Sequence, residues 1–167
     1  MIQVYTGNGK GKTSAAIGIA IRAVGAGLKV YIAQFCKKGL YSELKALKKL
    51  KGIKIEQFGR SGFIKKKPKK KDWILVQHGL QRIKEVIAKK SYDMIILDEI
   101  NIALHLGLLK VSDLIDTIKL ASKDTEIILT GRYAPSKIIE IADLVSKIEE
   151  LKHYYKKGVK ARKGIDY

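Results

Sequence analysis

Cysteine, acidic residues and long apolar segments are all scarce in this chain of 167 residues. A single cysteine, Cys36, excludes an intramolecular disulfide and fits a reducing compartment. We interpret it as a small hydrophobic residue at a strand end rather than as a metal ligand or nucleophile. No apolar stretch approaches the roughly 18 residues that a membrane-spanning helix needs, and the first apolar segment begins too early for a signal peptide. We therefore expect a cytoplasmic protein that folds as a single domain, residues 1–167.

The shortage of acidic residues makes the chain strongly basic, with 16 Asp and Glu against 34 Lys and Arg and a net charge of +18. Six lysines lie within residues 65–71, interrupted only by Pro68, yet without them the charge is still +12. Such diffuse basicity suits a protein that handles a polyanion such as triphosphate, and it is also found in heat-adapted proteins. The lysine run lacks interleaved aromatic residues, and the chain has no helix-turn-helix or ribonucleoprotein motif, so we do not expect nucleic acid as the main partner.

A glycine-rich run follows an apolar segment and precedes an Ala- and Ile-rich pattern of helical period. Its members are Gly7, Asn8, Gly9, Lys10, Gly11, Lys12 and Thr13. Glycines let consecutive backbone N–H groups point into one concavity, and the following helix presents its positive N-terminal end to the same anion. Lys12 can reach a phosphate, and the Thr13 hydroxyl is placed to ligate Mg²⁺. The run therefore predicts a phosphate-binding loop (P-loop) rather than a plain glycine turn.

The loop departs from the common spacing G-x-x-x-x-G-K-[ST]. Thr6 stands where the first glycine of that pattern belongs, and Gly7 comes one position later, so the loop is one residue tighter. Nucleotide binding remains the prediction, because strand, glycines, Lys-Thr and helix still follow in that order.

Apolar periodicity alternates between strand and helix, which predicts an α/β fold with a mainly parallel central sheet flanked by helices. We expect strands at residues 2–5, 28–35, 53–58, 93–97 and 126–130, with an edge strand within 144–151. Helices are predicted at residues 15–24, 41–50, 73–89, 111–121 and 136–142. Gly59, Gly62 and the lysine run predict that residues 59–71 form a mobile loop over the ligand site. The polar tail, residues 153–167, shows little packing signal.

Two carboxylates, Asp98 and Glu99, directly follow the apolar residues 94–97. In P-loop proteins such a strand lies beside the loop strand, which would turn both acids toward a Mg²⁺–phosphate cluster. Asp98 would hold metal-bound water, and Glu99 would ligate Mg²⁺ or orient a nucleophile. The alternative is that the acids cap a helix that begins near Asn101.

Two arginines are candidates for contacts with the nucleotide. Arg132 follows the predicted strand 126–130 on the sheet edge where such folds bind ligands, although a surface position fits almost equally well. Arg22 lies late in the first predicted helix and could face either solvent or a nucleotide. The histidines show no metal-ligand spacing with each other or with Cys36, so we expect them on helix surfaces or in the core.

Taken in order, these segments resemble a known family, the P-loop ATP:corrinoid adenosyltransferases, also called cob(I)alamin or cob(I)yrinic acid a,c-diamide adenosyltransferases. The resemblance runs nearly end to end and includes the shortened loop at residues 6–13. Further matching segments are residues 22–25, 34–35, 62–63, 77–79, 97–99, 130–132 and 142–143. The most diagnostic segments are residues 152–153, 158–161 and 164–167, because no generic ATPase motif predicts them.

The resemblance implies a RecA-like P-loop fold, a homodimer, and transfer of the 5′-deoxyadenosyl group of ATP to a reduced Co(I) corrinoid with release of triphosphate. ATP would lie reversed relative to ordinary P-loop enzymes, so that the ribose C5′ is exposed to the cobalt nucleophile. Mg²⁺, with Mn²⁺ as a substitute, and an electron donor for Co(II) are implied as well. The main alternative is a P-loop ATPase that acts on nucleic acid. A small-molecule kinase and a module that only delivers corrinoid are further alternatives.

Residue roles follow from the same resemblance. Backbone N–H groups of residues 8–13 and the two loop lysines would hold the triphosphate as charge accumulates on it, with Lys12 in a catalytic role. Thr13 and Glu99 would ligate Mg²⁺, and Asp98 would contact the ion directly or through water. Arg22 and Arg132 would contact the nucleotide.

Phe63 resembles an aromatic residue that packs against the lower face of the corrin, where it would exclude the axial ligand and make Co(II) easier to reduce. The family commonly has a second aromatic residue two positions later, where this chain has Lys65. The lysine run would then meet the carboxylate or amide rim of the corrin. Many members also carry an N-terminal extension that covers the ATP of the neighbouring subunit. This sequence starts at its first strand, and we therefore expect a more open site.

Overall fold

Six strands form one sheet in the computed structural model, which describes residues 1–39, 41–62, 64 and 67–166. The strands are β1 (Ile2–Thr6), β2 (Val30–Phe35), β3 (Ile53–Phe58), β4 (Met94–Asp98), β5 (Glu126–Thr130) and β6 (Leu144–Lys147). Their order in the sheet is β3-β2-β4-β5-β1-β6, and every pairing between them is parallel. The carboxyl ends of the strands therefore share one edge.

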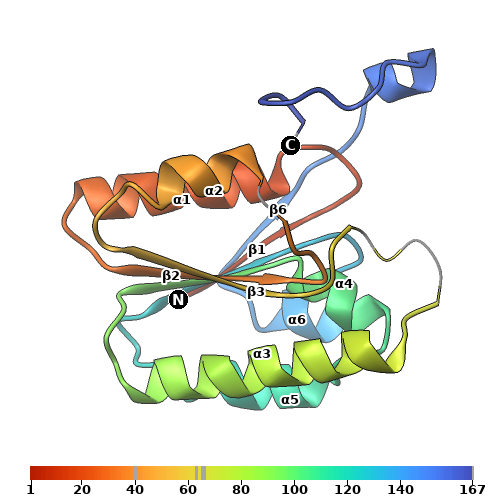
Figure 1. Ribbon diagram of the computed structural model, residues 1–167. Coiled ribbons are helices and arrows are strands. Elements are labelled where there is room, and N and C mark those ends of the chain that lie inside the picture. The colour runs from red at the N-terminus through yellow and green to blue at the C-terminus, as the bar shows by residue number, and fades with distance from the viewer. Residues whose placement is uncertain (40, 63, 65–66, 167) are drawn as a thin grey trace.

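Helices cover both faces of the sheet (Figure 1). On one face lie α1 (Lys12–Gly25) and α2 (Ser42–Leu47). On the other lie α3 (Lys70–Ala88), α4 (Ile100–His105), α5 (Val111–Ile118) and α6 (Ser136–Glu140). A short 3₁₀ helix, η1 (Tyr154–Lys157), follows β6 in the tail. The chain is thus a three-layer α/β domain, as its periodicity predicts.

The central strands β2, β4 and β5 are apolar on both faces because helices cover each face. In β4, Leu97 belongs to the core on the α3 side, whereas Ile96 belongs to the core on the α1 side. The stripe that α1 turns to the sheet consists of alanines such as Ala16 and Ala20, both of them buried. Small side chains at this spacing let the helix lie close to the strands and fix the start of α1 at the sheet edge.

Two expectations about the fold were wrong. The strand that ends in Asp98 does not lie beside β1, because β5 pairs with both β4 and β1 and separates them. In addition, α3 begins at Lys70, so part of the predicted loop 59–71 is helical. The Asp72 carboxylate accepts the Lys69 N–H at 2.8 Å and stabilises this earlier start. Asp72 also binds Arg60 through two hydrogen bonds of 2.6 and 2.8 Å, which tie the segment before the helix to its first turn.

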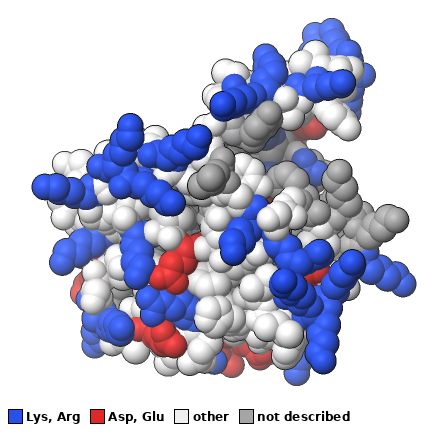
Figure 2. Space-filling view, in the orientation of Figure 1, with Lys and Arg blue, Asp and Glu red and all other residues white. Residues whose placement is uncertain are grey.

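Figure 2 shows Lys and Arg side chains over much of the visible face, with few acidic ones between them. The basicity is therefore distributed and not confined to the lysine run, as the composition predicts. Among the helices of the described residues, none is both long and apolar enough to cross a lipid bilayer.

Candidate functional site

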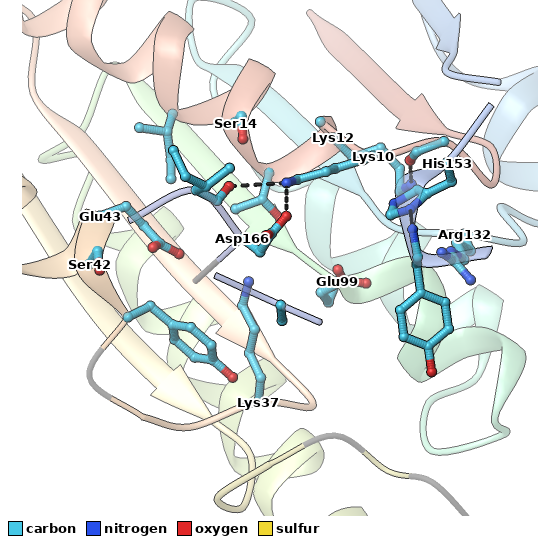
Figure 3. A pocket seen from close by; sticks show the side chains of 18 of the residues that line it. Lys10, Lys12, Ser14, Lys37, Ser42, Glu43, Glu99, Arg132, His153 and Asp166 are labelled. Carbon is cyan, nitrogen blue, oxygen red and sulfur yellow. Dashed lines mark hydrogen bonds and ion pairs between the residues drawn. The ribbon is translucent and has the colours of Figure 1, made fainter. Parts of the chain in front are cut away.

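A cavity of about 990 Å³ opens at the carboxyl edge of the sheet (Figure 3). One wall is the loop and the start of α1, residues 9–14. The opposite wall comes from the ends of β2, β4 and β5, and the tail closes a third side. The polar and aromatic residues that line it include Lys10, Lys12, Thr13, Lys37, Tyr41, Glu43, Glu99, Arg132, Tyr133, His153, Tyr154, Tyr155 and Asp166. A volume of this size is typical of a small-molecule site.

The glycines of the P-loop pack against the chain that follows β6. A Cβ atom on Gly7 would collide with the Ile148 carbonyl group, and one on Gly9 would lie 2.7 Å from the Glu149 carbonyl oxygen. The Gly9 N–H donates a hydrogen bond of 2.8 Å to the Ile148 carbonyl oxygen. That N–H, one of those predicted to hold triphosphate, therefore already has a partner. Gly7 and Asn8 do not line the cavity.

Gly11 and Lys12 form the junction between the loop and α1. Gly11 has a φ of 116°, a conformation that side chains rarely adopt, and it precedes the first residue of the helix. The Lys12 side chain is buried, and its Nζ donates a hydrogen bond of 2.6 Å to the Gly9 carbonyl oxygen. Burial, followed by the charge of Arg132, lowers the pKa of Lys12. The Lys12 side chain is thus held inside the loop by the Gly9 carbonyl oxygen.

Asp98 joins the P-loop to three strand ends. Its Oδ1 accepts hydrogen bonds from the hydroxyls of Thr13, at 2.8 Å, and Thr130, at 2.7 Å. Its Oδ2 accepts from Gln34 Nε2 at 3.1 Å and pairs with Lys37 Nζ at 2.7 Å. Asp98 and Thr13 are therefore in direct contact, although β5 lies between the strands β1 and β4. The contact is possible because β1 continues into the loop and α1, which cross back over the sheet edge.

Glu99 follows in a left-handed conformation, with a φ of 60°. Its N–H donates to the Thr130 hydroxyl at 3.0 Å, while its carboxylate lines the cavity and makes no hydrogen bond within the described part of the chain. Burial, and then the charge of Asp98, raise the pKa of Glu99, whereas Lys37 and the other nearby cations lower it. An uncommitted carboxylate on a strained residue at a cavity wall is a typical arrangement for a functional group.

Of the other predicted site residues, some line the cavity and others do not. Arg132 lines the cavity just after β5. Arg22 is exposed in the last turn of α1 and lies outside the cavity lining. Phe63 and Lys65 fall outside the described residues, whereas Ile64 lines the cavity.

Lys37 was missed by the sequence reasoning. It lies two residues after β2, and its side chain is buried beside Asp98 and over the ring of Tyr41, with Nζ 5.5 Å from the ring centroid. Burial alone would lower the pKa of Lys37, but Asp98, Glu99 and Glu43 outweigh it, so the pKa is raised. Its position after a parallel strand, on the same sheet edge as the P-loop, was the available signal.

The tail contacts the P-loop, although its sequence shows little packing signal. Lys10 Nζ donates to the Tyr154 hydroxyl at 2.7 Å, to the Ile165 carbonyl oxygen at 3.0 Å, and to the Asp166 carboxylate. The Asp166 carboxylate also accepts from the Tyr154 hydroxyl and from Arg162. In Figure 1 the end of the chain lies beside the N-terminal end of α1, and Figure 3 shows Lys10 pointing at Asp166. Periodicity could not reveal this, because the contacts are polar and span the chain.

The oxygen donors of the site fit Mg²⁺, although no group of three His, Cys, Asp or Glu residues in the described chain is arranged to hold a metal alone. Thr13 donates its hydroxyl proton to Asp98, so the oxygen lone pairs are available to a cation. Glu99 supplies a carboxylate that accepts no hydrogen bond from the residues that the structure describes. The Asp98 carboxylate is already engaged by Lys37 and by three uncharged donors, so it is less available to a cation than the other two groups.

A model of the family ATP:corrinoid adenosyltransferase BtuR/CobO/CobP matches residues 1–167. The corrinoid adenosyltransferase of Escherichia coli (strain K12) is 34% identical over 167 residues, which cover 100% of this chain and 85% of that protein. Corrinoid adenosyltransferase CobA of Salmonella typhimurium (strain LT2) is 33% identical with the same coverage. The corrinoid adenosyltransferase of Sinorhizobium sp is 31% identical over 171 residues, which cover 100% of this chain and 80% of the relative.

Solved structures of the same architecture are more distant in sequence. Flagellar accessory protein FlaH from Methanocaldococcus jannaschii superposes with a TM-score of 0.59 at 16% identity, covering 87% of this chain and 69% of that one. KaiC-like protein PH0186 from Pyrococcus horikoshii OT3 gives 0.58 at 20% identity, covering 91% and 73%. At this identity the likeness shows the fold alone, and it confirms the predicted RecA-like P-loop fold.

Proposed function

Because the chain belongs to the ATP:corrinoid adenosyltransferase family, we propose that it transfers the 5′-deoxyadenosyl group of ATP to the Co(I) centre of a corrinoid and releases triphosphate. The observation that carries the proposal is the composition of the cavity. Lys10 and Lys12 line it from the loop side and Arg132 from the opposite wall, next to Thr13 and Glu99. Cations next to oxygen donors for a metal suit a metal-bound polyphosphate.

The proposed reaction requires no nucleophile from the protein. Two electrons of Co(I) form the cobalt–carbon bond at the ribose C5′, and cobalt is formally oxidised to Co(III). The C5′–O bond breaks, and its electron pair leaves with the triphosphate. The side chains therefore have to orient ATP with C5′ exposed and to neutralise the leaving group.

The P-loop would neutralise the negative charge of the triphosphate. Lys12 would release the Gly9 carbonyl oxygen and bind a phosphate oxygen instead. Lys10 would likewise release Asp166 of the tail and bind a phosphate oxygen. Loop N–H groups other than that of Gly9 would add hydrogen bonds, and Arg132 would approach from the far wall. Arg22 would take part in nucleotide binding only if the nucleotide extended beyond the cavity.

Thr13 and Glu99 would hold Mg²⁺, or Mn²⁺ through the same oxygens, and Asp98 would orient Thr13. Bound Mg²⁺ supplies charge stabilisation to the phosphate oxygens. Ile64 lines the cavity, and this supports the proposal that the corrin binds there and that Phe63 would contact its lower face. A separate electron donor for Co(II), cytoplasmic location and a homodimer belong to the same proposal.

Anoxic incubation with Mg²⁺-ATP and chemically reduced corrinoid tests the proposal. We expect the light-sensitive spectrum of an alkylcobalt product, and we expect Lys12→Ala to abolish it together with ATP binding. Phe63→Ala should mainly impair reactions that start from Co(II); equal loss from Co(I) and Co(II) would contradict its assigned role. The alternative, a P-loop ATPase that acts on nucleic acid, instead predicts ADP and phosphate, released faster when DNA or RNA is added.

A further inference from the structure

The backbone after β2 is bent so that Lys37 enters the cavity. Cys36 has a φ of 57°, in the left-handed region that non-glycine residues seldom adopt, and its N–H donates to the Phe58 carbonyl oxygen at 3.1 Å. Gly59 packs directly on the bend: a Cβ atom there would lie 2.7 Å from the Cys36 carbonyl carbon and would collide with the Lys37 nitrogen. A strained residue directly after β2 and a glycine directly after the neighbouring β3 thus fix where Lys37 leaves the sheet.

The ion pair that Lys37 forms is almost completely removed from solvent. The exposed fractions of the Lys37 and Asp98 side chains are 7% and 2%, and their N–O distance is 2.7 Å. Removing two charges from water is expensive, and apolar replacements of such pairs are often as stable or more stable. Stability alone therefore does not account for a lysine at this position, and its charge must serve another purpose in the site.

The charge matters because of the two adjacent acids. Asp98 and Glu99, together with the Thr13 hydroxyl, would offer a divalent cation two negative charges and several oxygen ligands without any help from a nucleotide. Lys37 cancels one of these charges and occupies Asp98 Oδ2. Glu99 is then the only carboxylate of the pair that has no ion-pair partner in the described chain. A triphosphate brings further negative charge and oxygen ligands with it.

We propose that Lys37 is a positioning residue that acts as an internal counter-cation: by pairing with Asp98 it keeps free divalent metal out of the site, so that metal enters together with the nucleotide. The proposal rests on the nucleotide and metal site proposed above. It assigns to Lys37 the selection of the metal–nucleotide complex over the bare ion. Lys37 would thus set the order in which metal and nucleotide bind, and it would not take part in the transfer of the adenosyl group.

Mn²⁺ without nucleotide is the probe, because the electron paramagnetic resonance signal of the free ion reports the unbound concentration. Lys37→Gln removes the charge and keeps a donor for Asp98, whereas Lys37→Arg keeps the charge. We expect Lys37→Gln to bind Mn²⁺ at least about tenfold more tightly than the wild-type protein, because one positive charge near the ion is gone. Lys37→Arg should bind Mn²⁺ as weakly as the wild type. Unchanged Mn²⁺ affinity in a folded Lys37→Gln protein would overturn the proposal.

Lys54→Gln is the matched control, since Lys54 forms an exposed ion pair with Glu56 at 3.2 Å on β3; it should leave Mn²⁺ binding unchanged. Circular dichroism verifies that each variant is folded, and Lys37→Met replaces Lys37→Gln if the latter is not. A second readout compares Mn²⁺ affinity with and without ATP. The factor by which ATP increases the Mn²⁺ affinity should be smaller in Lys37→Gln than in the wild-type protein. An unchanged factor would contradict the proposed order of binding. Neither readout requires adenosyl transfer, so failure of the proposed reaction would remain distinguishable.

Discussion

Gly9→Ala tests whether the tight P-loop is shaped by the chain that follows β6. An added Cβ would lie 2.7 and 2.8 Å from the Glu149 carbonyl oxygen and carbon, and 2.9 Å from Ile148 Cγ2. Two of these three atoms belong to the backbone, which cannot turn aside as a flexible side chain can. The loop must therefore move away from residues 148–149, and the hydrogen bond from the Gly9 N–H to the Ile148 carbonyl oxygen must lengthen or break.

The expected loss of stability combines two effects. Overpacking of a close contact destabilises by about 1–3 kcal/mol, and loss of one hydrogen bond adds about 1 kcal/mol. Taking about 3 kcal/mol for the sum, and about 2–4 °C per kcal/mol at this chain length, the melting temperature should fall by about 6–12 °C. ATP affinity should fall by at least about tenfold, because Lys12 bonds to the Gly9 carbonyl and would move with the loop.

Thermal unfolding followed by circular dichroism and calorimetric ATP titration measure the two effects. Gly25→Ala is the matched control, because it makes the same chemical change at the end of α1, where an added Cβ meets no atom within 4 Å. It should leave ATP affinity unchanged and stability equal or slightly higher. If Gly9→Ala unfolded and bound ATP as the wild type does, the close approach would not be what requires glycine.

Three further substitutions have expected outcomes. Asp166→Asn should tighten ATP binding by about two- to fivefold at low salt, because Lys10 is no longer held by a competing carboxylate, and the gain should shrink at high salt; weaker binding in calorimetric titrations would mean that Asp166 instead supports the site. Burial raises the pKa of Glu99, so in metal-free protein the free energy of unfolding should fall as pH rises from the ordinary glutamate pKa through the raised one. Glu99→Gln should abolish that fall, giving a higher melting temperature than the wild type at pH 7 and an equal one in acid; no difference at pH 7 would contradict the assignment. Asp72→Asn should speed tryptic cleavage at Lys69, because it removes the negative charge and one of the two oxygen acceptors that hold Arg60 and the Lys69 N–H; an unchanged rate by mass spectrometry would exclude that tether.

Local sequence signals located the loop and most of the fold. The alanine stripe of α1, the apolar runs of the strands and the order strand, glycines, Lys-Thr, helix are short-range patterns, and the structure reproduces each of them. The meeting of Thr13 with Asp98 was also predictable, because parallel strands present their carboxyl ends at one edge. These features depend on neighbours in the chain or on a general rule of parallel sheets.

The rest of the site depends on contacts between distant residues. The position of β4 beyond β5 follows from sheet order, which periodicity does not encode. Lys37 enters the cavity because Cys36 is left-handed and because Gly59, directly after β3, packs against it; no sequence pattern reveals either feature. The tail joins the site through Lys10 and Asp166, 156 residues apart. Polar contacts of this range have no period, and only the family resemblance singled out the end of the chain.

The inorganic product of a single turnover is the most direct test of adenosyl transfer. Enzyme, Mg²⁺-ATP and chemically reduced corrinoid would be mixed without oxygen, and phosphorus NMR of the quenched mixture would be compared with the amount of alkylcobalt formed. We predict triphosphate in equal amount to the cobalt–carbon product, with no ADP. ADP and orthophosphate without an alkylcobalt product would show that the cavity directs attack to the terminal phosphorus instead of C5′.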